Sequence, residues 1–308
     1  MKTAVGRTVN RRERSRLIFY SLMIALPLVQ FAVFYIYVNF NSFLLAFKTT
    51  DPLTYKVSLT LSNFSDAWKT FTSRSYLLKN SLTLFFWITI VGITFALIFS
   101  FYLYKRYPAH GLFKVILFLP KIIPTVVFSI LFRYLVTDGY SALVQQITGL
   151  QVPGLLDGTE QAKFNTVLIY CVWMSFGVNV LLFTGAMEGI NESVVESAKL
   201  DGVNIVQEFI HITVPMIFPT LTTFIVVGMA GIFTNQMELY SLFGPDGMHI
   251  GTLGFFLFVN ANSSDVVAKQ GYLSYHELAA MGLIFTFMVF PITLIVRKLL
   301  EKFGPSPD

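Results

Sequence analysis

Long apolar runs separated by polar segments constrain the fold of this chain most strongly. They lie at about 17–38, 80–104, 113–136, 164–187, 212–236 and 276–298. Each run is close to the roughly 20 residues that cross a bilayer as a helix. None alternates as a barrel strand does, and only helices and closed barrels satisfy their backbone in lipid. Because 55% of the 308 residues are hydrophobic and only 13% are charged, we expect an all-α membrane protein with six transmembrane helices.

Basic residues predict the orientation of these spans. They gather before the first run, in the loop after the second run (Lys105, Arg106) and at or beyond the end of the last run (Arg297, Lys298, Lys302). Because cytoplasmic loops carry the excess of Lys and Arg, we expect both termini to be cytoplasmic. The alternation of six spans then places residues 188–211 on the cytoplasmic side. The first run follows RRERSR but is too long for a signal peptide and has no small-x-small cleavage site, so we expect an uncleaved helix.

The polar insertion at 188–211 is predicted to form two short helices joined by a turn. Ser193 with Glu196 fits a capping box at the start of ESVVESAKL, and Asn204 with Gln207 fits a second box before IVQEFIHI. Gly202 stands between them, where a residue that adopts positive φ without a Cβ penalty would end the first helix.

The same stretch carries a motif with fixed spacing, E-x-A-x-x-D-G-x(9)-I-x-[LV]-P-x-x-x-P. Its positions are Glu196, Ala198, Asp201, Gly202, Ile212, Val214, Pro215 and Pro219, with Phe209 inside the gap. The motif resembles the EAA loop of permease subunits in bacterial binding-protein-dependent ABC importers. Ser197 and Val214 depart mildly from alanine and leucine. FLPKIIPTVVFSILFRYL (118–135) and FTNQMELYSLFGPDG (233–247) are similar to segments of the sugar-importer, maltose-type branch.

The resemblance implies the fold of an ABC importer permease of type I in the bacterial cytoplasmic membrane. It divides the chain into a basic N-terminus (1–16), a first helix with an external segment (17–74), a permease core (75–300) with the EAA loop at 188–215, and a tail (301–308). The loop would form a coupling helix that docks on a cytoplasmic ATPase. Its expected contacts are Glu196, Ala198, Asp201, Gly202, Phe209, Ile212 and Pro215. The implied partners are a second permease, an ATPase dimer that uses ATP and Mg, an extracytoplasmic binding protein and a carbohydrate.

Polar residues inside the spans are the second source of functional expectations, because they should face protein or water rather than lipid. They are Trp173, Ser175 and Asn179 in the fourth run, and Asn235, Gln236 and Glu238 at the end of the fifth. Amides, carboxylates and aromatic faces suit sugar hydroxyls and ring faces, so these residues are candidates for the solute path. Hydrogen bonding between helices within the bundle is the alternative role.

The chain lacks several motifs that would indicate chemistry of its own. There is no G-x(4)-G-K-[ST] for phosphate, no G-x-S-x-G and no H-E-x-x-H, and the four histidines share no metal-ligand spacing. We therefore expect no cofactor or metal on this chain, and ATP hydrolysis in a partner. The alternatives are a permease for a non-sugar solute (glycerol phosphate, amino acid or peptide), a self-sufficient secondary transporter or a membrane-embedded enzyme. A secondary transporter should show an internal repeat or mid-span carboxylates, and neither is present.

Overall fold

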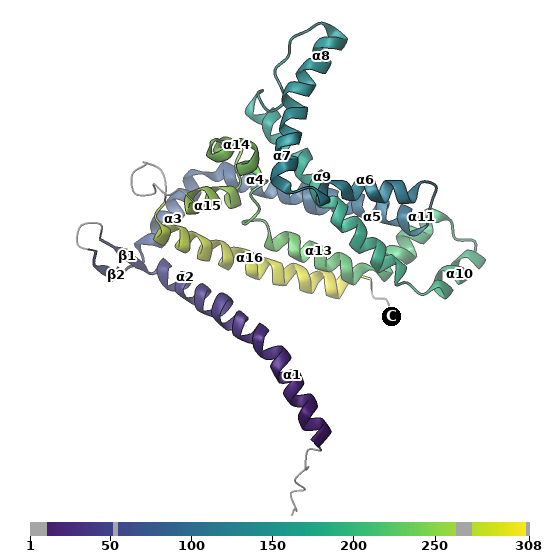
Figure 1. Cartoon of the computed structure of the whole chain (residues 1–308), viewed down its shortest axis with the longest axis horizontal. Helices are drawn as coiled ribbons and strands as arrows, with labels where there is room; N and C mark the ends of the chain where they lie inside the picture. Colours follow the sequence, from purple (N-terminus) through teal and green to yellow (C-terminus); the bar gives the residue numbers. More distant parts are fainter. Residues whose placement is uncertain (1–10, 52–54, 263–272, 306–308) are drawn as a thin grey trace, which may run out of the picture. The chain divides into compact units, whose positions relative to one another are not determined.

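The computed structural model describes residues 11–51, 55–262 and 273–305 (Figure 1). Most of the predicted basic N-terminal segment and the last residues of the predicted tail lie outside this part of the chain. The described residues divide into two compact units. The first comprises residues up to Trp68 together with Leu273–Leu283, and the second comprises Lys69–Tyr272 and the residues from Ile284 onward.

The first unit begins with one continuous helical run, α1 (Arg11–Gln30), η1 (Phe31–Tyr37) and α2 (Val38–Ala46). The most apolar 18 residues within Arg14–Ala46 have a mean hydropathy of 2.2, and none of them is buried within the chain. A helix that is apolar all round suits lipid or another membrane helix. This confirms an apolar first helix, although it continues eight residues beyond the predicted end.

A short β-hairpin and a helix, joined by polar contacts, follow this helix in the first unit. Strands β1 (Lys48–Thr50) and β2 (Val57–Leu59) pair antiparallel, and α3 (Ser62–Ser73) follows. The buried Asn63 amide donates to the carbonyl oxygens of Ala46 and Lys48, at 2.9 and 2.8 Å. His276, in the first turn of α16 (Tyr275–Phe303), lies 3.2 Å from the Leu45 oxygen through Nδ1. These bonds satisfy backbone groups where the helix stops.

The second unit is built around two long helical spans that pack side by side. One runs through α4 (Ser75–Phe85), η2 (Phe86–Val91) and α5 (Gly92–Tyr104), and the other is α9 (Glu160–Glu188). Figure 1 shows α5 alongside α9. Ser100 Oγ lies 2.9 Å from the Val180 oxygen, which joins the two helices by a buried polar contact. Two apolar clusters flank the pair, one around Tyr170 and one around Phe183.

The third predicted run, 113–136, is not one helix. It is divided into α6 (His110–Ile122) and α7 (Thr125–Tyr134), and the second part continues through η3 (Leu135–Gly139) and α8 (Tyr140–Thr148). Pro124 causes the break, because a proline forces the preceding residue, here Ile123 with ψ 135°, into extended backbone. The span by length and composition is therefore Thr125–Thr148, and the predicted boundaries were wrong. Gly177 lets α6 approach α9, since a Cβ there would lie 2.3 Å from the Leu117 oxygen.

The fifth predicted run, 212–236, is also broken. The helical run Ile205–Met216 meets α13 (Phe218–Ala230) at an angle of 69°. A second bent pair follows, Leu239–Ile250 against α15 (Leu253–Asn262), at 116°. The described residues thus contain five unbroken helices long and apolar enough to cross a membrane, or up to seven spans if each bent pair counts as one. The predicted helical class is confirmed, while the count of six remains a prediction.

Candidate functional site

The EAA-like loop folds into a pair of short helices at one end of the second unit (Figure 1). The first is α10 (Glu192–Leu200), whose N-cap is Asn191: its side-chain oxygen accepts from Ser193 N at 3.1 Å. The predicted capping box of Ser193 and Glu196 was wrong, because the helix starts earlier and Ser193 already lies inside its first turn. The end of α10 at Leu200 agrees with the predicted helix.

Gly202 ends this helix as predicted, with φ +78°. The backbone N–H of Gly202 donates to Lys199 O and that of Val203 to Ala198 O, both at 3.1 Å. This pair of bonds is a Schellman motif, which satisfies the last carbonyl groups of a helix. A Cβ at Gly202 would meet no atom within 4 Å. The turn therefore needs glycine for its backbone conformation and not for lack of space.

The second helix of the pair begins with the predicted capping box. Asn204 Oδ1 accepts from Gln207 N at 2.9 Å, and Gln207 Oε1 accepts from Asn204 N at 3.0 Å. The helix runs through α11 (Ile205–Glu208), η4 (Phe209–Thr213) and α12 (Val214–Met216). The connection between the two helices is therefore short, and its backbone N–H groups from Gly202 to Asn204 are all hydrogen-bonded.

The helix pair exposes an apolar surface formed by Leu200, Ile205, Val206 and Ile210, of which Leu200 is 89% exposed. Glu196 and Asp201 of the motif are exposed, whereas Phe209, Ile212 and Pro215 are half-buried against the rest of the unit. A separate cavity of about 350 Å³ in the helix pair is lined by residues that include Gly202, Gln207 and His211. Exposed apolar side chains rimmed by polar groups are typical of a protein-binding surface. The contact residues expected from the resemblance do not include these four, which follow from helical spacing once the register is known.

The opposite side of the helix pair is fixed to the second span. The Phe101 and Phe209 rings lie 4.9 Å apart, and Val195 is buried in the same cluster. Lys105, directly after α5, forms an ion pair with Glu208, whose side chain is only 6% exposed. A buried carboxylate needs such a partner, because an unpaired charge is costly to bury. The prediction did not include this pair, although Lys105 at the end of a span and the acidic cluster of the insertion were both visible.

The predicted path residues of α9 point in different directions. Trp173 is 38% exposed, and the centroid of its ring lies 5.3 Å from that of the Phe128 ring of α7. Ser175 faces α5: its Oγ would lie 3.6 Å from a Cβ at Gly92, and it donates to Val172 O at 2.9 Å. Asn179 is half-buried one turn further on. The structure therefore does not bring Trp173 and Ser175 to one surface.

Asn235, Gln236 and Glu238 lie together in an irregular turn, beyond the end of α13 at Ala230. Met237 and Glu238 both have positive φ, at 58° and 54°, and Asn235 Oδ1 accepts from Met237 N at 2.9 Å. Thr252 Oγ1 donates to the backbone carbonyl oxygen of Asn235 at 2.6 Å. Side-chain bonds of this kind hold backbone that ordinary residues adopt only under strain.

Gln236 differs from its neighbours in the turn because its Oε1 is buried and has no hydrogen-bond partner within the described chain. Asn235 lines a narrow cavity of about 180 Å³ together with Thr89 and Gly228. A buried acceptor without a donor is a site that a bound hydroxyl group or water can satisfy.

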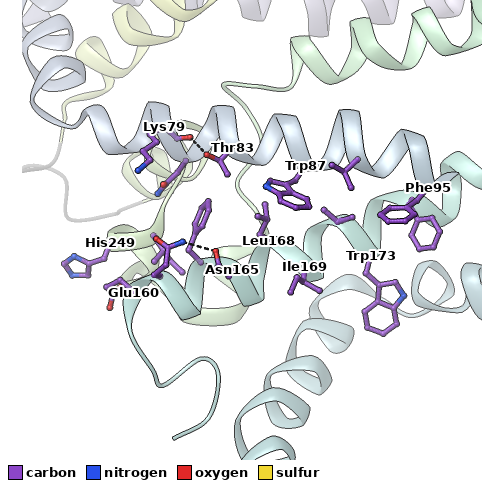
Figure 2. Close-up of a pocket in the computed structure, with 17 residues that line it drawn as sticks. Lys79, Thr83, Trp87, Phe95, Glu160, Asn165, Leu168, Ile169, Trp173 and His249 are labelled. Carbon is purple, nitrogen blue, oxygen red and sulfur yellow. Dashed lines mark hydrogen bonds between the residues drawn. The ribbon is translucent and has the colours of Figure 1, made fainter. Parts of the chain in front are cut away.

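A cavity of about 840 Å³ lies between the second and fourth spans (Figure 2). Of the predicted path residues only Trp173 lines it. Its other walls come from residues that the prediction did not include, among them Asn80, Trp87, Gln161 and Asn165. The side chain of Gln161 donates to Asn165 Oδ1 at 2.9 Å, so two of the amide groups that line the cavity are already paired with each other.

The long apolar spans and the broken helices are typical of a multi-pass membrane protein. Residues 88–306 match the family described as binding-protein-dependent transport system inner membrane component. The chain belongs to this family, whose members are transport proteins and not enzymes.

Relatives of known name and structure agree with this assignment. The chain is 27% identical to the arabinooligosaccharides transport system permease protein AraP of Bacillus subtilis (strain 168) over 287 residues, which cover 89% of this chain and 86% of that protein. It is 28% identical to the maltodextrin transport system permease protein MdxF of the same organism over 208 residues, 63% of this chain and 46% of that protein.

A solved structure shares the fold. It is the crystal structure of a bacterial ABC transporter involved in the import of the acidic polysaccharide alginate, with a TM-score of 0.76, 16% identity and coverage of 95% of this chain and 98% of that one. A second structure, of the alginate transporter in complex with alginate pentasaccharide-bound periplasmic protein, has a TM-score of 0.75 at 17% identity and covers 98% of this chain and 99% of that one.

Proposed function

We propose that this chain is the transmembrane permease subunit of an ATP-driven importer in a bacterial cytoplasmic membrane, and that its solute is a sugar or oligosaccharide. Membership of the transport family carries the general assignment. The names of the relatives, for arabinooligosaccharides and for maltodextrin, support the substrate class. A permease for a non-sugar solute is the remaining alternative within the family.

The single observation that carries the coupling role is the exposed apolar surface of Leu200, Ile205, Val206 and Ile210 on a capped helix pair. A partner ATPase would bury this surface. The pair is held from behind by the Lys105–Glu208 ion pair and the contact between Phe101 and Phe209. Motion of the ATPase would then move the second span together with the helix pair, because packed elements shift as rigid bodies.

The solute path is proposed to involve Asn179, Asn235, Gln236 and Glu238, with Ser175 and Trp173 supporting the helices around it. The unpaired Oε1 of Gln236 supports this role, since a sugar hydroxyl could donate to it. A second permease would complete the path, and an extracytoplasmic binding protein would deliver the solute. ATP and Mg would be bound by the ATPase and not by this chain.

Uptake measurements test the assignment. A strain that lacks this chain is supplied with labelled arabino-, malto- and alginate-derived oligosaccharides and with glycerol phosphate and a peptide. We expect loss of uptake for one carbohydrate class and recovery when the wild-type chain is returned. Loss of glycerol phosphate or peptide uptake alone would assign a non-sugar solute.

A further inference from the structure

The cavity between the second and fourth spans has polar groups at one end only. Lys79 and Asn80 lie near the start of α4, Glu160 is the first residue of α9, and His249 of η5 (Gly244–Ile250) joins them. Figure 2 shows Lys79, Glu160 and His249 at the same end of the cavity, and Phe95 and Trp173 at the other. Both spans therefore run along the cavity in the same direction, each from its polar N-terminal part toward the apolar end.

The far part of the cavity is apolar. Its walls there are Val91, Phe95, Ile169, Val172, Trp173 and Phe176, with Trp87 between the two ends. From Lys79 to Phe95 a helix rises by about 24 Å at 1.5 Å per residue. A bilayer with its headgroups is about 40–45 Å thick, so the cavity is about as long as one leaflet.

A sugar does not fit this distribution of polar groups. Its hydroxyl groups would be left without partners along the apolar walls, and each unpaired hydroxyl is costly to bury. A molecule with one polar end and a long hydrocarbon tail fits both parts. In a membrane-spanning pair of helices, the available molecule of that kind is a phospholipid.

The charges at the mouth favour an anionic headgroup. Glu160 is paired with Lys163, whose Nζ lies 2.9 Å from Glu160 Oε1. Among the ion pairs of the described chain none includes Lys79. A lysine at the membrane surface attracts anionic lipid, and here its charge is not cancelled by a neighbour.

We propose that this cavity is a binding site for one anionic phospholipid, with the headgroup at Lys79 and an acyl chain against Trp87, Phe95 and Trp173. The site is formed by this chain alone. It is separate from the EAA-like helix pair and from the turn that carries Gln236, and it does not depend on which solute is transported.

Native mass spectrometry of the full chain tests the proposal. The protein is released from nanodiscs that contain equal amounts of phosphatidylglycerol and phosphatidylcholine with the same acyl chains. We expect one retained phospholipid, with phosphatidylglycerol favoured about fivefold, the effect of one lysine at the surface. Lys79→Gln should remove the preference, and the matched control Lys56→Gln should keep it.

A variant that fills the apolar part separates a built site from bulk lipid. Val172→Trp should lower retention of both lipids about tenfold, whereas Val33→Trp, on the exposed first helix, should not. If Val172→Trp fails to fold, as judged by size-exclusion chromatography, the comparison of Lys79→Gln with Lys56→Gln tests the proposal instead. An unchanged preference for phosphatidylglycerol in Lys79→Gln would then overturn it. Equal retention of both lipids by the wild-type chain, equal retention by the two tryptophan variants, or displacement of the lipid by millimolar oligosaccharide would overturn the proposal.

Discussion

Gly202 is the residue on which the geometry of the coupling loop depends most. Its φ of +78° closes the turn between α10 and α11. A residue with a Cβ pays about 1–2 kcal/mol in this region, and a β-branched residue is a true outlier there. We predict that Gly202→Val loses most uptake while its abundance in the membrane stays near normal.

Gly202→Asn is the matched variant, because asparagine tolerates the left-handed region. It should retain most of the uptake, since no atom lies within 4 Å of the added Cβ. Normal transport by Gly202→Val, or equal loss in both variants, would contradict a role for the backbone of this turn.

Asn235 allows a test of the solute path at the level of single atoms. Its Oδ1 accepts from Met237 N, so Asn235→Ala removes both this bond and the amide donor. Loss of one hydrogen bond costs about 0.5–1.5 kcal/mol, and uptake should fall by up to about tenfold.

Asn235→Asp keeps the acceptor for Met237 N but replaces the amide donor with a negatively charged carboxylate. Lower uptake in both variants with intact basal ATPase activity is the result expected if the amide acts on the solute. If Asn235→Asp transports normally, the residue only holds the turn. Asn179→Ala should also lower uptake, and unchanged uptake in Asn179→Ala and Asn235→Ala would leave both residues with structural roles alone.

Local hydrogen bonds were the most predictable features at this scale. The Asn204–Gln207 box and the positive φ of Gly202 follow from residue type and spacing. The Ser193–Glu196 box was wrong because Asn191 precedes it and caps better in its place. Trp173 and Ser175 lie on different faces of α9. Which element each face contacts depends on where α5 and α7 pack, and one sequence does not contain that information.

The ion pair between Lys105 and Glu208 connects two elements, the second span and the coupling helices. Removing one partner leaves a mostly buried charge, which costs about 3 kcal/mol or more. We predict that Lys105→Glu and Glu208→Lys each lower uptake per ATP hydrolysed, and that the exchanged double variant recovers part of it.

The exposed Lys114 provides the charge-reversal control for this pair, because it lies on α6, outside the coupling helices, and has no ion pair among the described residues. Limited proteolysis at residues 203–211 should be faster in the single variants than in the wild-type and double-variant chains. Wild-type coupling in Lys105→Glu would show that the pair is not needed for transmission.

Helix existence was predicted well at the scale of elements, and helix continuity was not. Hydropathy alone located the apolar runs, since every one of them contains helix. The break at Ile123–Pro124 cuts the third run, because proline chemistry competes with hydropathy. The fifth run is cut at Ile217, two residues before Pro219. The bent pair from Leu239 to Asn262 was missed, since neither half is long enough to register as a span.

The orientation of the whole chain remains a prediction from its basic residues. Cysteine at position 160 should react with an impermeant thiol reagent from outside the cell, and cysteine at position 199 should not. The parent chain is its own control, because Cys171 is buried and should stay unlabelled. The reverse labelling pattern would invert the proposed topology.

Capture of the partner ATPase tests the central claim most directly. The chain is purified from its native membrane in mild detergent, and its partners are identified by mass spectrometry. We expect a P-loop ATPase and a second permease with the wild-type chain. The double variant Leu200→Asp, Val206→Asp places two charges on the exposed apolar surface and should lose the ATPase, keep the second permease and abolish uptake. Uptake that continues without any copurifying ATPase, or an ATPase that stays bound to the double variant, would contradict the account.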